Sequence, residues 1–256
     1  MAAEKSWAEM SATMSQDDFM LKDECIIINY NDECTGFDNK YNVHKFLAGQ
    51  PKGVLHRAFS VMLFDGEGRL LLQQRAASKI TFPRVWTNTC CSHPLGGQNP
   101  DEVDAPLSGT AEPMGVKHAA VRKLIHELGT KVGALSAEKF KYMGRVHYWA
   151  ADTVTHGEAS PWGEHEVDYL LLYQLEKGEV LQLDPNPDEV MDVAWVSSEE
   201  LKARMADPAL LWSPWFRVIA RELLFPWWAA RPAPRPTPGR APESRPEPWP
   251  ESRPEA

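Results

Sequence analysis

The stretch GVKHAAVRKLIHELG, residues 115–129, is the strongest local indication of the fold in this sequence. Its apolar residues recur every four positions, which places them on one face of a helix. These residues are Val116, Ala120, Leu124 and Leu128. Gly129 follows directly, and glycine is the residue that most often ends a helix. The stretch therefore predicts an amphipathic helix.

Strands are predicted on both sides of this helix. Before it come a strand that begins at Glu24 and a β-hairpin over residues 57–76, with glycines in its turn. Residues 95–115 are rich in Gly, Pro and acids, which predicts a surface loop. Three further strands are predicted after the helix, over residues 141–150, 164–175 and 189–197.

Two more helices complete the pattern. Ser197 and Glu200 form a capping box before one of them, and Ser213 caps the other, which Pro226 is expected to end. Strands that alternate with helices in one continuous stretch predict a single domain of the α/β (α+β) class.

The flanks of the chain differ from this pattern. Residues 1–23 are interpreted as an N-terminal extension and residues 24–228 as the folded domain. Residues 229–256 hold nine of the 21 prolines and repeat ESRPE, which predicts a disordered or polyproline-II tail able to bind an unknown partner.

Composition excludes several classes of function. The formal net charge of -9 argues against a nucleic-acid-binding surface. We expect no membrane span, since no apolar run reaches the roughly 18 residues that one requires, and the first residues do not resemble a secretory signal. Four sparse cysteines indicate reduced thiols. We expect a cytoplasmic monomer, with the plastid as the alternative compartment.

The stretch WGEHEVDYLLL contains acidic residues spaced by two. In a strand this spacing puts Glu164, Glu166 and Asp168 on one face, where they form either a solvated surface or part of a site. His44, His56 and His93 could complete a mixed nitrogen and oxygen site for Mn²⁺, Mg²⁺ or Zn²⁺. Their separation in sequence leaves open that each histidine is merely structural.

Two adjacent cysteines stand in TNTCCSHPL, residues 87–95. Adjacent cysteines make a strained disulfide, and the spacing does not suit a thiolate zinc site. Cys91 is therefore either a reactive thiol or a buried one, and it points the same way as His93 if the segment is extended.

A third group of candidate residues is basic. Lys40 stands in KYNVH, and Arg75 and Lys79 lie four residues apart in QQRAASK. Such residues can clamp an anion such as a phosphate, although an exposed salt-bridging pair is the ordinary alternative.

Several motifs occur together in a fixed order between residues 40 and 216. They are KYNVH, LHRAFSV, LLQQRAASKITFP, WTNTCCSHPL, HELG, WGEHEVDYLLL, NPDEV and SPWF. In this order the sequence closely resembles type 1 isopentenyl-diphosphate isomerase. The resemblance implies the Nudix fold, a mixed β-sheet between helices.

The resemblance also implies roles for individual residues. It implies one divalent metal ion bound by His44, His56, His93, Glu164 and Glu166, and a Mg²⁺ ion held by Glu127 together with the substrate diphosphate. Lys40, Arg75, Lys79 and Ser92 match diphosphate-binding positions. Cys91 and Glu166 match the two catalytic positions, supported by Tyr148 and Trp215.

The implied reaction interconverts isopentenyl and dimethylallyl diphosphate, for isoprenoid biosynthesis. One proton adds at C4 and another leaves C2 through a tertiary carbocation, which requires an acid and a base. Glu166 with Tyr148 is expected to donate and Cys91 to accept.

Two alternatives stay open. One is a Nudix-type diphosphate hydrolase, although Lys123 and His126 stand where two metal-binding glutamates of R-E-x-x-E-E-x-G belong. The other is an inactive metal-binding scaffold that acts through the Pro-rich tail.

Overall fold

The computed structural model describes residues 14–47, 49, 52–107 and 111–230. Its helices are α2 (Gln16–Lys22), α3 (Lys40–His44), α4 (Met114–Leu128), η1 (Ala137–Lys139), α5 (Thr153–His156), α6 (Ser198–Ala206), α7 (Pro214–Ile219), the π-helical turn η2 (Ala220–Leu224) and α8 (Phe225–Ala230). The strands are β1 (Glu24–Ile28), β2 (Cys34–Asn39), β3 (His56–Phe64), β4 (Leu70–Arg75), β5 (Trp86–Thr87), β6 (Cys90–Ser92), β7 (Lys141–Ala151), β8 (Gly163–Gln174) and β9 (Val190–Val196).

The strands of the described residues form one mixed sheet around β3. Strand β3 pairs in parallel with β8 and antiparallel with β1, β4 and β6, while β7 pairs antiparallel with β8 and β9 with β4. In the parallel pair His56 lies opposite Glu166. The pairing therefore brings together two predicted metal ligands that are 110 residues apart in the sequence.

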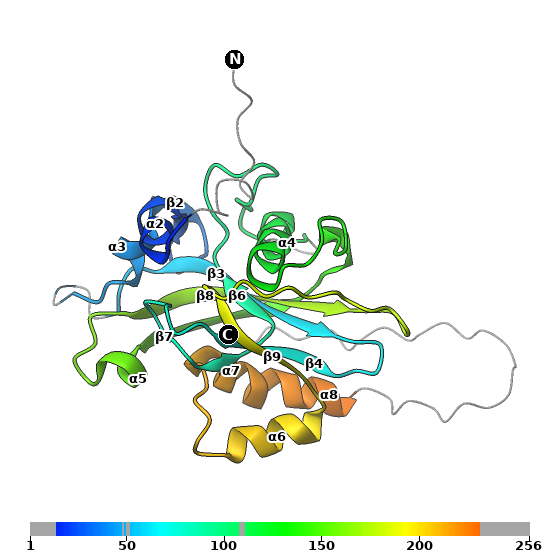
Figure 1. Cartoon of the computed structure of the whole chain (residues 1–256). Coiled ribbons are helices and arrows are strands. Elements are labelled where there is room, and N and C mark those ends of the chain that lie inside the picture. The colour runs from blue at the N-terminus through cyan, green and yellow to red at the C-terminus, as the bar shows by residue number, and fades with distance from the viewer. Residues whose placement is uncertain (1–13, 48, 50–51, 108–110, 231–256) are drawn as a thin grey trace, which may run out of the picture.

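Helices cover both faces of this sheet (Figure 1), with α4 on one face and α6, α7 and α8 on the other. All four apolar residues of the α4 stripe are fully buried, and they pack with Phe59, Val61 and Leu63 of β3. The alternate residues Met62 and Phe64 pack with α7 on the opposite face. This alternation is what a strand buried on both faces requires, and it confirms the predicted mixed sheet between helices.

The predicted ends of several elements are confirmed. Gly129 caps α4 in the left-handed conformation, with φ of 62°. The capping box at Ser197 and Glu200 is formed, and the Ser213 side chain accepts the backbone N–H of Phe216.

One predicted end is wrong, because the last helix does not end at Pro226. The backbone N–H of Phe225 donates to Ala220 O, five residues earlier, which closes a π-helical turn, and α8 begins there. The helical backbone therefore continues through Pro226, which is the second residue of α8 and directly follows the π-helical turn.

The predicted N-terminal extension contributes to the fold. Within it, α2 has a complete capping box at Ser15 and Asp18, and its Phe19 and Met20 are buried. Residues 1–13 of the extension and residues 231–256 of the Pro-rich tail lie outside the described residues. No helix of the described part of the chain is long and apolar enough to cross a membrane.

Candidate active site

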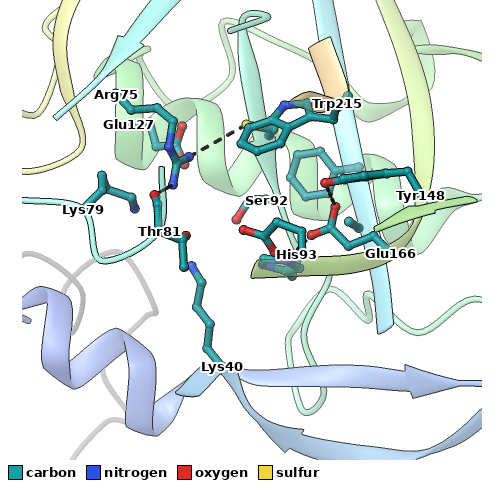
Figure 2. A pocket seen from close by; sticks show the side chains of 15 residues that line it. Lys40, Arg75, Lys79, Thr81, Ser92, His93, Glu127, Tyr148, Glu166 and Trp215 are labelled. Carbon is teal, nitrogen blue, oxygen red and sulfur yellow. Dashed lines mark hydrogen bonds and ion pairs between the residues drawn. The ribbon is translucent and has the colours of Figure 1, made fainter. Parts of the chain in front are cut away.

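A pocket of roughly 420 Å³, its open mouth included, lies where α3, α4, α7 and the central strands meet. The residues predicted for catalysis and diphosphate binding all line it, namely Lys40, Arg75, Lys79, Cys91, Ser92, Tyr148, Glu166 and Trp215. His93, Glu127 and Glu164 line it as well. Figure 2 shows Arg75 and Lys79 on one side of the pocket and Tyr148, Glu166 and His93 on the other.

Five predicted metal ligands converge at one end of the pocket. Each of these residues offers one side-chain nitrogen or oxygen, and these five atoms all lie within 4.8 Å of one another. The residues are His44, His56, His93, Glu164 and Glu166. All five residues are buried, and they come from α3, β3, the end of β6 and β8. The three histidines thus lie together rather than apart, and Glu164 and Glu166 are buried rather than part of a solvated surface.

The histidine rings are oriented for a cation. His44 Nδ1 lies 2.7 Å from Lys40 O and His56 Nδ1 lies 2.8 Å from Val54 O, so in both rings Nδ1 carries the proton. Each Nε2 then presents a lone pair to the cluster. Backbone carbonyls fix metal-binding histidines in this way.

Unpaired atoms within the cluster point to the same conclusion. His44 Nε2 and Glu164 Oε2 lie 2.7 Å apart, but their geometry is not that of a hydrogen bond. Within the described residues neither atom has a hydrogen-bond partner, and neither has His56 Nε2. Buried polar atoms left unpaired are costly, and a divalent cation would satisfy all of them. The donor set therefore fits a divalent metal ion.

Glu166 connects this cluster to the pocket. One carboxylate oxygen lies 2.8 Å from His93 Nε2, and the other accepts the hydroxyl of Tyr148. Burial acts to raise the pKa of Glu166, but the nearby imidazole of His56 and the hydrogen bond from Tyr148 outweigh it and hold the pKa below its ordinary value. Burial and the Glu166 charge raise the pKa of Tyr148 well above its ordinary value.

The two adjacent cysteines face different surroundings. Cys90 is fully buried in the core beside α4, whereas Cys91 lines the pocket, and both are free thiols. Burial raises the pKa of Cys91 to about 12, although the guanidinium of Arg75, with Nη1 3.9 Å from the sulfur, acts to lower it.

The basic side of the pocket is built from fixed side chains. Arg75 Nε and Nη2 each donate to a backbone carbonyl at 2.9 Å, from Phe82 and Thr81. The side chain of Lys79 is only 8% exposed, and its ammonium lies 2.6 Å from Glu189. Burial lowers the pKa of Lys79 to about 8, against the opposing effect of Glu189. Arg75 and Lys79 are therefore not an exposed salt-bridging pair.

Known proteins share this sequence and fold. The NUDIX domain model matches residues 54–216. Isopentenyl-diphosphate delta-isomerase of Schizosaccharomyces pombe is 43% identical over 215 residues, which cover 82% of this chain and 85% of that protein. The chloroplastic isopentenyl-diphosphate Delta-isomerase I of Arabidopsis thaliana is 43% identical over 82% of this chain and 68% of that protein.

This chain belongs to the isopentenyl-diphosphate delta-isomerase family, with the Nudix fold. The predicted family and the predicted class of enzyme are thereby confirmed. Among solved structures, a Deinococcus radiodurans protein aligns with a TM-score of 0.47 at 18% identity, over 77% of this chain and 98% of that one.

The isomerase carries an altered Nudix helix, α4. The ammonium of Lys123 lies 3.1 Å from Glu127 Oε1, and it lies 3.1 Å from His126 Nδ1. The other Glu127 oxygen accepts Gln73 Nε2 at 3.1 Å. Glu127 Oε2 also accepts Cys90 Sγ at 3.4 Å, so the buried carboxylate, which still lines the pocket, keeps a free lone pair on Oε1. This fits one oxygen ligand of a Mg²⁺ ion whose other ligands are waters and phosphate oxygens.

Trp215 covers the pocket of the isomerase between its two sides (Figure 2). Its indole N–H donates to Asn88 Oδ1 at 3.2 Å, and its ring lies edge to face with Phe82 at 5.3 Å between centroids. Two other tryptophans, Trp86 and Trp162, do not line the pocket. Trp86 packs in the core beside Arg204, and Trp162 packs against Tyr41.

Sequence reasoning missed several residues of the site. Ser60 and Thr81 line the pocket, and Ser60 donates to buried Asp168 at 2.8 Å. Burial and the Glu166 charge raise the pKa of Asp168 well above its ordinary value. Ser60 and Cys91 are opposite each other in the β3–β6 pair, which no local pattern reveals. Glu189 was part of the NPDEV motif but had no predicted role.

Proposed function

We propose that this protein converts isopentenyl diphosphate to dimethylallyl diphosphate in the pocket described above. Glu166, in contact with Tyr148, delivers a proton to C4, and Cys91 removes one from C2. One observation carries the proposal: the Glu166–Tyr148 pair and the Cys91 thiol line the same pocket as the basic side chains of Arg75, Lys79 and Lys40. An allylic proton shift requires such a donor and acceptor on one substrate.

The diphosphate binds on the basic side. Lys40 begins α3, whereas Arg75 ends β4 and Lys79 lies four residues beyond it; all three line one pocket, and Ser92 adds a hydroxyl. Arg75 is held by two carbonyls, so its guanidinium needs little reordering to receive an anion. Glu127 and the diphosphate together hold Mg²⁺, which neutralises part of the phosphate charge.

The histidine and glutamate cluster holds the second divalent ion, as Zn²⁺, Mn²⁺ or Mg²⁺. When bound, that ion supplies Lewis acidity that fixes and polarises the Glu166 carboxyl group. His93 contacts one oxygen of the Glu166 carboxylate and Tyr148 donates to the other, so both oxygens are oriented. The carboxyl group is thus positioned before substrate arrives.

Trp215 acts on the carbocation. Its indole face stabilises positive charge, an effect of about 2 kcal/mol or more in a desolvated site. Trp215 is itself buried and is kept in place by Asn88 and Phe82. Its ring also excludes water, which would otherwise trap the cation as an alcohol.

The direction of proton transfer can be tested with solvent deuterium. Incubated in D₂O with Mg²⁺ and isopentenyl diphosphate, the wild-type protein should form dimethylallyl diphosphate with deuterium in a methyl group. Cys91→Ala should lose product formation by about 10²–10⁴-fold, the usual contribution of a positioned acid or base. It should still exchange deuterium into the C4 position of recovered isopentenyl diphosphate, because the donor at C4 remains and the cation can return.

Cys90→Ala is the matched control, since it removes the neighbouring thiol on the other face of β6. It should keep isomerisation within about threefold of wild type. Absence of C4 exchange in Cys91→Ala would instead make Cys91 the donor and Glu166 the acceptor. No conversion by a folded, metal-loaded wild type would overturn the proposed function.

The two alternatives make different predictions. A Nudix-type hydrolase releases phosphate or pyrophosphate, and the Lys123 ammonium against Glu127 weighs against it, since a lysine cannot replace a metal ligand. A scaffold that acts through the tail loses function on deletion of residues 229–256 and keeps it in Cys91→Ser. Phosphate release and activity of the truncated protein, measured beside the deuterium assay, distinguish all three.

We also propose that residues 24–228 with helix α2 form the catalytic unit. Cytoplasmic action and a monomeric state stay predictions, with the plastid as the alternative compartment. The Arabidopsis relative is named as chloroplastic. A fluorescent fusion of the full chain tests the compartment, and light scattering tests the oligomeric state.

A further inference from the structure

Glu189 is a buried acid to which the proposed reaction gives no role. It directly precedes β9, is only 3% exposed, and is the glutamate of the NPDEV motif. Its backbone N–H donates to Asn186 O at 2.9 Å, and its carbonyl accepts Ala76 N at 2.9 Å. These bonds attach the 185–189 turn to the end of β4, next to Arg75.

The two oxygens of this carboxylate have different partners. Oε2 lies 2.6 Å from the ammonium of Lys79, and Oε1 accepts Gln16 Nε2 of α2 at 3.0 Å. Gln16 Nε2 also donates to Asp188 O at 3.0 Å. Gln16 of α2 therefore holds one oxygen of the Glu189 carboxylate, while the other oxygen binds the ammonium of Lys79.

Lys79 needs such a partner. A lysine side chain has four rotatable bonds and three donors on a compact charge, so its position depends on what holds the ammonium. Among the described residues, Glu189 is the only side chain with which Lys79 forms an ion pair. One donor of the ammonium points to Glu189, and two remain for phosphate oxygens.

The surrounding charges increase this dependence. Lys79 is faced by Glu189 from the 185–189 turn, and by Lys40 of α3, Arg75 of β4 and Lys123 of α4. Three of these four groups are cations, and burial already lowers the pKa of Lys79 to about 8. Glu189 is the group that keeps Lys79 charged near neutral pH.

We propose that Glu189 is a positioning residue for the diphosphate, which acts by holding Lys79 charged and aimed into the pocket. This inference rests on the proposed function for the identity of the substrate. Its prediction for binding of inorganic diphosphate does not depend on catalysis. The role of Glu189 in diphosphate binding and the proposed function can therefore be contradicted independently of each other.

The test is a double-mutant cycle with Glu189→Gln and Lys79→Met. Glu189→Gln should raise KM and the dissociation constant of inorganic diphosphate with Mg²⁺ by about tenfold, and change kcat less than threefold. In the Lys79→Met background the same change should add less than about twofold, because the residue through which Glu189 acts is gone.

A pH profile separates this role from a structural one. Protonated Lys79 binds the anion, so wild-type affinity should fall as pH rises through about 8. Without Glu189 the pKa of Lys79 decreases further, and the fall should begin about one unit lower. In Lys79→Arg the guanidinium stays charged, and Glu189→Gln should not shift the profile.

Asp65→Asn is the control for loss of a buried carboxylate, since Asp65 pairs with Arg69 at 2.7 Å, remote from the pocket. It should lower thermal stability without changing KM or the pH profile. An effect of Glu189→Gln that persists undiminished in Lys79→Met, or an unchanged diphosphate affinity, would overturn the inference. Wild type that binds diphosphate but does not isomerise would overturn the proposed function instead.

Discussion

Arg57 shows how one residue can couple the fold to the site. Its side chain is fully buried and donates to the Asp32 carboxylate at 3.0 Å, to Asp32 O at 2.7 Å and to Asp104 O at 2.8 Å. His56, the preceding residue on β3, faces the metal cluster. The network around Arg57 therefore fixes the strand that carries one of the five ligands.

We expect Arg57→Lys to lower the free energy of unfolding by about 3 kcal/mol, because a lysine cannot reproduce three divergent hydrogen bonds in a buried site. Arg69→Lys is the matched control, since Arg69 pairs with Asp65 but is half exposed. Arg69→Lys should lower the free energy of unfolding by about 1 kcal/mol or less. Urea unfolding checks both variants, and equal losses would contradict the assigned role of Arg57.

Helix α4 illustrates what is decided at the scale of an element. Its apolar stripe and its Gly129 cap follow from local sequence, but its first turn does not. The Asp104 carboxylate accepts the backbone N–H groups of Gly115 and Val116 at 2.8 and 2.9 Å. Glu102, in the same predicted surface loop, is buried and pairs with Arg122. Two acids therefore anchor this loop to α4.

The C-terminal cap of α4 gives a prediction at this scale. A Cβ at Gly129 would lie 2.0 Å from Asp184 O, in addition to the strain of φ at +62°. Gly133 has φ of +81° with open space around it, so Gly133→Ala isolates the strain. We expect a loss of about 1 kcal/mol for Gly133→Ala and about 3 kcal/mol or more for Gly129→Ala. Thermal unfolding of both variants measures the difference, and similar losses would exclude the close contact.

The metal cluster belongs to the scale of the whole molecule, because its ligands come from α3, β3, β8 and the end of β6. A bound ion would join these elements, and its removal would leave buried acceptors unpaired. Binding to the folded state alone stabilises by about 4 kcal/mol at a thousandfold excess over Kd.

We therefore expect a chelator to lower the Tm of the metal-loaded protein by about 10 °C. Cys91→Ala keeps all five ligands and should show the same decrease. His44→Ala removes one ligand, so this variant should bind the ion weakly. The chelator should therefore lower its Tm little or not at all. Differential scanning calorimetry with and without chelator checks this, and an unchanged Tm in wild type would argue against a metal ion in the cluster.

The predicted elements and the candidate site residues rest on different kinds of information in the sequence. Strand period two and helix period near four are local properties, so β8, α4 and their buried faces follow from the sequence. The ordered motifs identified the family, and with it Lys40, Cys91 and Tyr148. The end at Pro226 was mispredicted because the helix continues past it through a π-helical turn, which no local pattern reveals.

The sequence alone determined which residues this protein can use: two carboxylates spaced by two on one strand, adjacent cysteines on opposite faces, and an altered Nudix helix. Only the tertiary structure decided that three distant histidines converge, which ring nitrogens face the cluster, and that Glu189 holds Lys79. The physical reason is range. Periodicity acts between neighbours along the chain, whereas a metal site or a buried ion pair depends on how strands β3 and β8 pair and how helices close over them.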